Sequence, residues 1–274
     1  MTANTGLDWS QVDIAVPSRM PNRGIQMAGF RYHDVAPVDI AMIPHPSVTL
    51  LFDLSDNGVT YDVSGNPVTG NAIVGLSPDA LRVASSGASE VLQVRLSPVI
   101  AAAIFGDPEL LGGTVTPLAP VWGPRAGTLH DQLRAAPSWD DRFALTLQFL
   151  QGRASCAFAV APEVAYAWGE TVRYRGRLRI DDLATETGWS RQHLWSRFRS
   201  QIGLSPKRAA ELVRFDHAAH LLAAGHSPVT AAFEAGYADQ SHLHRHAKAF
   251  AHISPAAVAS APWLAIDDIA WPAR

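Results

Sequence analysis

The sequence predicts an α+β protein, with a β-rich N-terminal domain that includes a helical hairpin and an all-α C-terminal domain. Short apolar segments separated by turn-forming residues fill residues 25–96, a pattern typical of an all-β sandwich or barrel. Residues 206–223 carry apolar side chains at helical spacing and contain no internal Gly or Pro. A short pattern also occurs twice between residues 179 and 255, which indicates one supersecondary unit used twice.

The N-terminal domain is expected to begin with an extended arm at residues 1–24, because these residues show little periodicity. Turn formers such as Asn57-Gly58 and Ser86-Gly87 separate the strands that follow. The strands are expected at residues 25–32, 48–54, 59–63, 72–76, 82–84 and 91–96. Further on, a helix is expected at 99–105, a turn at 108–113, and a helical hairpin at 127–135 and 140–151.

The first copy of the repeated pattern indicates two short helices joined by a tight turn. Gly188 is expected to end the first helix, because glycine enters the left-handed conformation without a steric penalty. Ser190 is expected to cap the second helix, whose buried side holds Leu194 and Phe198 at i and i+4. The opposite face of this helix carries Arg191, Gln192, Trp195 and Arg199.

The second copy predicts the same arrangement, with Gly236 in the turn and Asp239 or Ala238 opening the second helix. The helix at 206–223 connects the copies, and its eighteen residues span roughly 27 Å at 1.5 Å each. This length is near the roughly 34 Å between successive major-groove faces of B-DNA. One chain is therefore expected to reach two adjacent grooves.

The outward faces of the two second helices suit the major groove, because Arg forms paired hydrogen bonds with guanine and Gln with adenine. Trp195 adds an apolar surface that suits a thymine methyl group. The candidate DNA-binding residues are Ser190, Arg191, Gln192, Trp195, Ser196, Arg199, Gln240, Ser241, His242, His244, Arg245 and Lys248.

This stretch resembles the DNA-binding domain of AraC/XylS-type transcriptional regulators, over about 100 of the 274 residues. The likeness rests on the two linked units in order, on Gly203-x-Ser205-Pro206, and on the segment from Gly236 to Arg245. It implies a DNA-binding domain at 156–274, with helix-turn-helix motifs at about 179–206 and 228–255 and a C-terminal tail.

Three residues depart from the pattern of that family. Ser196 stands where the family usually has Arg, Ala247 where it has Phe, and His252 where it has Gly. The first departure predicts weaker base reading by the first unit. The other two predict a less tightly packed second unit.

The N-terminal residues 1–155 resemble the sensor half of a subset of those regulators. The likeness lies in Pro44-His45-Pro46 before a strand and in the segment 91–98 before an Ala-rich helix. It implies a cupin-like β-barrel that binds an effector or mediates dimerisation. His45 is the candidate effector-binding residue, and a structural loop histidine is the alternative. The implied partners are double-stranded DNA, a small-molecule effector, RNA polymerase and a second copy of the chain.

The charge distribution agrees with a basic DNA-binding domain joined to an acidic domain. Residues 1–169 carry nine Arg against fifteen Asp and Glu, whereas residues 170–260 carry twelve Lys and Arg against eight acids. No apolar run is long enough for a membrane span and no signal peptide is evident, so a cytoplasmic protein with no membrane partner is expected. The single Cys156 excludes an intramolecular disulfide framework.

Two segments outside the repeated units remain open to more than one interpretation. Arg173, Arg175, Arg177 and Arg179 indicate either contact with DNA phosphates or a solvated basic linker. The tail after residue 262 carries Trp263, Ile266, Ile269 and Trp271, and is expected to pack on a domain or to contact a partner.

Other function classes find less support in the sequence. His242 and His246 at i and i+4 form a possible metal pair, but no Glu or Cys nearby completes a tetrahedral site. No metal or other cofactor is expected, and the usual catalytic motifs are missing. The alternatives to a regulator are a metal-dependent cupin-like enzyme, for which residues 25–96 offer His33, His45 and Glu90, and a non-specific DNA-architectural protein.

Overall fold

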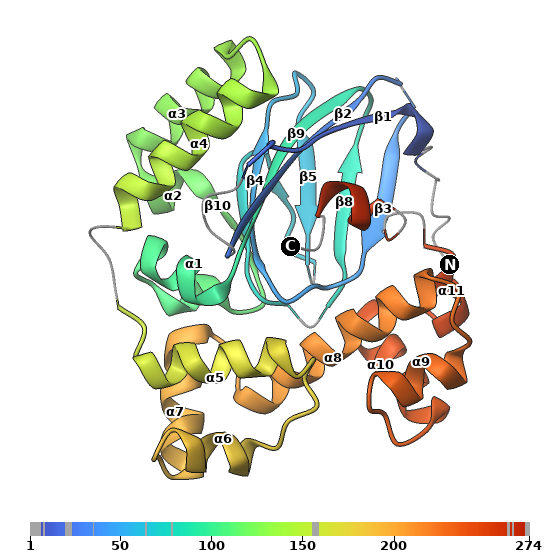
Figure 1. The fold of residues 1–274 in the computed structure, drawn as a ribbon. Helices are drawn as coiled ribbons and strands as arrows, with labels where there is room; N and C mark the ends of the chain where they lie inside the picture. The colour runs from blue at the N-terminus through green and yellow to red at the C-terminus, as the bar shows by residue number, and fades with distance from the viewer. Residues whose placement is uncertain are drawn as a thin grey trace.

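The computed structural model describes residues 7–271 except for 8, 20–23, 35, 64, 78, 155–158, 262, 263 and 265. Two antiparallel sheets form the N-terminal half, and a helical C-terminal half lies along one end of them (Figure 1). This arrangement confirms the predicted α+β class. Cys156 and Trp263 lie outside the described residues.

The strands pair in two sheets, of six and four strands. The larger has the order β1-β2-β9-β4-β7-β10 and the smaller β3-β8-β5-β6. In the larger sheet, Val94 of β9 lies opposite both Met27 of β2 and Leu50 of β4, so three buried apolar side chains share one row. The strands are β1 Val12–Ala15, β2 Ile25–Tyr32, β3 Val38–Met42, β4 Val48–Asp53, β5 Val59–Asp62, β6 Val68–Thr69, β7 Ala72–Val74, β8 Leu81–Ser85, β9 Ser89–Leu96 and β10 Val115–Pro117.

The facing sides of the sheets form a common apolar core from Leu51, Tyr61 and Val74 with their neighbours. The six expected strands are all present, with ends shifted by up to two residues. Residues 12–15 of the expected arm instead form the edge strand β1 on β2, and β3, β6 and β10 were not expected. These elements are short and depend on pairing with distant residues, which local periodicity does not reveal.

Helices α1 (Pro98–Phe105), α2 (Leu118–Trp122), α3 (Pro124–Ala135) and α4 (Trp139–Ala154) cover one side of the larger sheet, with a 3₁₀ turn η2 (Pro108–Leu111) after α1 (Figure 1). The predicted hairpin of α3 and α4 is confirmed. The Trp122 ring joins these helices to the sheet, since its centroid lies 4.9 Å from Phe149, 5.7 Å from Phe105 and 6.3 Å from Phe52.

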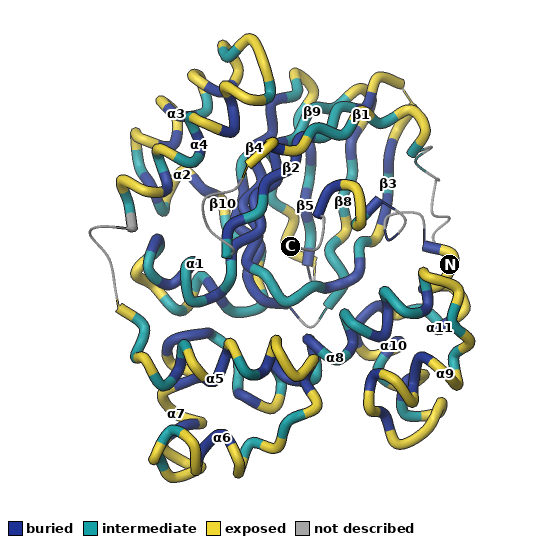
Figure 2. Tube along the Cα trace, in the orientation of Figure 1, coloured by how far each residue is buried: buried dark blue, intermediate teal, exposed yellow. Residues whose placement is uncertain are grey.

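The C-terminal half consists of helices, and several of them begin at a side-chain cap. Ser190 accepts a hydrogen bond from the His193 backbone N–H, and Asp239 accepts one from that of His242, as the sequence predicts. Helix α8 is largely buried between the two units, whereas the outer sides of α6, α7 and α9 are exposed (Figure 2). The helices are α5 Pro162–Arg173, α6 Ile180–Glu186, α7 Arg191–Ile202, α8 Pro206–Ala223, α9 Pro228–Glu234, α10 Gln240–Ala251, α11 Pro255–Ala259 and α13 Asp267–Ala270.

A second hydrophobic core, separate from the one between the sheets, runs through both halves and includes residues of β4, β9, α1, α7 and α8. At one point the two backbones almost touch. A Cβ atom on Gly203, at the end of α7, would lie 2.9 Å from the Gly112 backbone nitrogen that follows η2. Gly203 also has a φ of 85°, so both space and backbone conformation require glycine there.

The end of α10 corresponds to the end of α7, but a histidine occupies the left-handed position. His252 has a φ of 59°, and among the described residues only Arg175 shares positive φ without being glycine. The His252 imidazole lies 3.8 Å from the Asp79 carboxylate of the N-terminal half, and both side chains are well exposed. An exposed pair of this kind contributes little to stability, so the backbone strain is expected to dominate.

His252→Gly is therefore expected to raise the free energy of unfolding by about 0.5–1 kcal/mol, because glycine removes the strain but adds entropy to the unfolded chain. Urea unfolding measures the change. Gly203→Ala is the matched opposite, expected to lower the free energy of unfolding by at least about 1 kcal/mol. A less stable His252→Gly variant would show that the contact with Asp79 outweighs the strain.

Candidate nucleic-acid interface

The second helix of each unit exposes most of the polar residues singled out from the sequence. On α7, Ser190, Arg191, Gln192, Trp195, Ser196 and Arg199 are all exposed, with Leu194 and Phe198 fully buried beneath them. On α10, Gln240, Ser241, His244, Arg245 and Lys248 are exposed, and Leu243 is fully buried. The two helices lie at opposite ends of α8 (Figure 1).

The exposed residues of α7 do not share one environment. The Arg191 guanidinium lies 3.4 Å from the Asp181 carboxylate of α6, and the Arg199 guanidinium lies 5.2 Å from the centre of the Trp195 ring. Trp195, Ser196 and Arg199 border a cleft of about 810 Å³. The opposite wall of this cleft is η2 with its acidic residues Asp107 and Glu109. The N-terminal half therefore lies close to the C-terminal part of the α7 face.

His242 differs from its exposed neighbours on α10, because its side chain is only half-exposed and packs inward. The ring of buried Tyr237 meets both His242 and His246 edge to face, with centroids 5.2 Å apart in each pair. Burial lowers the pKa of His246 to about 4, and the His242 charge acts in the same direction. Within the part of the chain that the structure describes, no group of three or more His, Cys, Asp or Glu side chains is arranged to hold a metal.

Three of the four arginines of the basic linker have partners within the protein. Arg173 pairs with Glu170, Arg175 contacts the His217 ring at 3.0 Å, and Arg177 donates to the Glu234 carbonyl of the second unit at 3.3 Å. A Cβ atom on Gly236 would collide with the Arg177 side chain, so this glycine allows the close approach. Arg177 thus connects the segment before the first unit to the turn of the second unit.

The C-terminal tail connects the two halves through Asp267. One carboxylate oxygen accepts a hydrogen bond from Arg95 of β9 at 3.2 Å, and the other lies 3.1 Å from His220 Nε2 of α8. Next to this pair, Trp271 packs 4.1 Å beneath the Arg95 guanidinium and 6.3 Å from the Phe30 ring. The prediction that the tail packs on a domain is confirmed.

The charges around Asp267 stabilise one another. Burial opposes ionisation of Asp267, but Arg95 and His220 outweigh it and lower its pKa to about 2. The hydrogen bond to Asp267 raises the pKa of His220 to about 9, although burial opposes it. Burial raises the pKa of nearby Asp216 to about 6, and its carbonyl oxygen is 2.8 Å from His220 Nδ1.

His45 lies close to these charges and does not line the cavity between the two sheets. Burial lowers its pKa well below the usual range, and the Arg95 charge adds to this effect. Its Nε2 atom lies 3.3 Å from the Thr49 hydroxyl, and its ring borders a small cavity of about 30 Å³. A separate cavity of about 100 Å³ lies between the two sheets, and residues of the tail complete its wall.

Two helix-turn-helix units on one linker helix, each with an exposed polar second helix, define a DNA-binding protein of the double helix-turn-helix class. The model of a helix-turn-helix domain family matches residues 183–261. The "Uncharacterized HTH-type transcriptional regulator YbfI" of Bacillus subtilis is 40% identical over 70 residues, which is 26% of this chain and 26% of that relative. Residues 183–261 therefore form a helix-turn-helix domain similar to that of an HTH-type transcriptional regulator.

Solved structures resemble the chain over most of its length at low identity. ToxT from Vibrio cholerae, in its P21 form, has a TM-score of 0.51 and 10% identity, over 89% of this chain and 99% of that one. ToxT bound to (E)-4-(8-methylnaphthalen-1-yl)but-3-enoic acid has a TM-score of 0.50, 10% identity and the same coverage. These likenesses show a common fold for both halves together. None of the helices in the described residues is long and apolar enough to cross a membrane.

The pairing of His220 with Asp267 predicts a pH-dependent stability. Because the folded-state pKa of His220 is raised from 6.5 to about 9, its stabilisation is complete below about pH 6.5 and is lost as the pH rises through 9. The His220 side chain is 37% exposed, so solvent screens part of this interaction. We therefore expect the free energy of unfolding at pH 6 to be about 1–2 kcal/mol higher for wild type than for His220→Gln.

Urea unfolding at intervals between pH 6 and pH 10 checks this expectation. The difference between wild type and His220→Gln should shrink toward zero by pH 10, and Asp267→Asn should remove the same pH dependence. A difference that stays constant over this range would mean that the ion pair does not form.

Proposed function

We propose that this protein is a sequence-specific DNA-binding transcription regulator that reads two adjacent major grooves and responds to a small-molecule effector. The observation that carries the proposal is the pair of exposed polar helices, α7 and α10, at the two ends of α8. Each has an apolar back that is buried in the domain and an outer face with Arg and Gln. Such helices enter the major groove and contact base edges with their first turns.

We assign base reading to Arg191, Gln192 and Trp195 in the first groove, and to Gln240, Ser241, His244 and Arg245 in the second. Ser190, Arg199 and Lys248 are assigned to contacts with the DNA backbone or neighbouring bases, together with Ser196. His242 is assigned a smaller part than in the sequence-based prediction, because its ring packs against Tyr237.

The assignment divides the chain into a regulatory part at 1–155 and a DNA-binding part at 156–274. The cavity between the sheets supports an effector site in the first part, and the ligand-bound form of ToxT offers an analogy. We assign no catalytic activity or cofactor to the chain. RNA polymerase and a second copy of the chain complete the proposed partners.

A non-specific DNA-architectural protein is the competing function, and selection of binding sites separates the two. Purified full-length protein is mixed with fragmented genomic DNA, and bound fragments are sequenced. A regulator enriches a motif with two elements about one helical turn apart. An architectural protein binds fragments without enriching a motif, and that result would overturn the proposal.

Arg245→Ala is expected to weaken binding to the selected site by about 1–3 kcal/mol, roughly 5-fold to 150-fold, and to relax preference at one base pair. Titration of labelled DNA by fluorescence anisotropy measures the change. Arg125→Ala, at an exposed position of α3 in the N-terminal half, removes the same charge away from the proposed grooves and is the matched control. Equal effects of the two substitutions would show that Arg245 acts only through its charge.

The two elements of the selected motif are expected to differ in information. The first unit has Ser196 in place of Arg, and its Arg199 faces a cleft with Asp107 and Glu109, which repel phosphates. The second element should therefore be the more strongly specified one. Equal information in both elements would contradict this interpretation of α7.

A further inference from the structure

The cavity between the two sheets has the features of a ligand site with defined chemistry. We propose that it binds a small uncharged molecule, of about one ring, that is mostly apolar and carries one hydroxyl or carbonyl oxygen. This inference rests on the proposed effector-responsive function and specifies the class of effector. It concerns the N-terminal half and the tail, and it involves no residue assigned to DNA.

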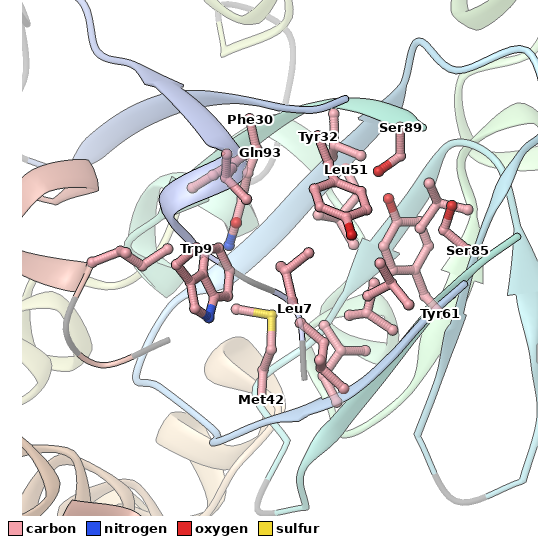
Figure 3. A pocket seen from close by; sticks show the side chains of 18 of the residues that line it. Leu7, Trp9, Phe30, Tyr32, Met42, Leu51, Tyr61, Ser85, Ser89 and Gln93 are labelled. Atoms are coloured by element: carbon pink, nitrogen blue, oxygen red, sulfur yellow. The ribbon is translucent and has the colours of Figure 1, made fainter. Parts of the chain in front are cut away.

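Size sets the first limit on the ligand. The cavity has a volume of about 100 Å³, somewhat less than the roughly 150 Å³ of an engineered apolar cavity that binds benzene. A group larger than a single ring therefore does not fit without movement of the walls. Trp9 and Met42 line one side of the cavity (Figure 3), and small shifts of these side chains would admit a substituent.

The Gln93 amide and the Trp9 indole nitrogen lie at one end of the cavity, and hydroxyl groups line the other end. The side chains of Tyr32, Tyr61, Ser85 and Ser89 gather there, opposite Trp9 and Met42 (Figure 3). Ser85 already donates to the Gly87 carbonyl at 2.8 Å. The Tyr61 hydroxyl has no hydrogen-bond partner in the structure, and the residue is only 1% exposed, so water does not reach the hydroxyl either. An unmade hydrogen bond of this kind is unfavourable, and a ligand oxygen would complete it.

The Tyr61 hydroxyl acts as a donor. Burial raises its pKa well above the usual range, and the charge of Asp53 acts in the same direction, so the group keeps its proton. A ligand oxygen with a free lone pair is the complementary group. Hydroxyl and carbonyl oxygens both meet this requirement.

Charge excludes ionised ligands. The described residues that line the cavity include no Lys, Arg or His, so a carboxylate would find no cation there. Asp267 is their one carboxylic acid, and its oxygens are directed to Arg95 and His220. A cationic ligand would have to compete with these partners. The walls thus favour a neutral molecule.

The tail makes the cavity relevant to the DNA-binding half. Ile266, Asp267 and Trp271 form part of its wall, and Asp267 also contacts His220 on the linker helix α8. A molecule seated against Ile266 and Trp271 therefore touches the element that holds α8. A change in the position of the tail on binding would therefore change its contact with α8, which connects the two recognition helices.

Isothermal titration calorimetry of the full-length protein with four probes of one ring tests the proposal. Phenol is neutral with an oxygen, toluene is neutral without one, benzoate is anionic and benzylamine is cationic. Phenol should bind at least 10-fold more tightly than benzoate or benzylamine. Benzoate or benzylamine binding as tightly as phenol, or no heat from phenol, would overturn the proposal.

Tyr61→Phe should weaken phenol binding by about 10-fold, the loss of about 1.4 kcal/mol for one hydrogen bond, and leave toluene binding unchanged. Tyr166→Phe removes a hydroxyl on the exposed side of α5 and is the control, expected to change neither affinity. Unchanged phenol binding in Tyr61→Phe would show that the ring is bound elsewhere. Selection of DNA sites requires no ligand. An enriched DNA motif together with no phenol binding would therefore contradict the proposed ligand class but support the DNA-binding function.

Discussion

The arrangement of the two halves depends on the buried carboxylate of Asp267. It lies between Arg95 of β9 and His220 of α8, and the Arg95 and Asp267 side chains are 9% and 13% exposed. Buried charges are stable only when they are paired, and loss of one partner leaves the others uncompensated. The tail, the larger sheet and the linker helix must therefore keep their positions together. The close backbone approach of Gly112 and Gly203 fixes a second point of the same interface.

This constraint gives the two helix-turn-helix units different surroundings. The C-terminal part of the α7 face lies across a cleft from Asp107 and Glu109, whereas at the end of α10 the exposed His252 approaches Asp79. Movement of the N-terminal half would thus change the access of DNA to the first unit most directly. The cavity wall and the contact with α8 share the same tail, so occupancy of the cavity and the position of α8 are physically linked.

Much of the fold followed from local signals in the sequence. Ser190, Asp239 and Gly188 mark helix ends by chemistry that acts within a few residues. Short apolar segments between turn formers mark β2, β4 and β9, which are central in the larger sheet. The edge strands β1 and β10 were not predicted, because three or four residues carry too little pattern. The contact of Arg95 with Asp267 spans 172 positions of the chain and has no local signature. The same holds for the cavity and for the cleft beside α7, which exist only after the sheets and helices have packed.

Differential scanning calorimetry of the full-length protein tests most directly whether the two halves form one unit through this interface. We expect wild type to unfold in a single transition whose calorimetric and van 't Hoff enthalpies agree. Asp267→Asn should lower the transition temperature and make the calorimetric enthalpy larger than the van 't Hoff enthalpy, because the two halves then unfold less cooperatively. Two separate transitions in wild type, or a variant indistinguishable from it, would contradict the account.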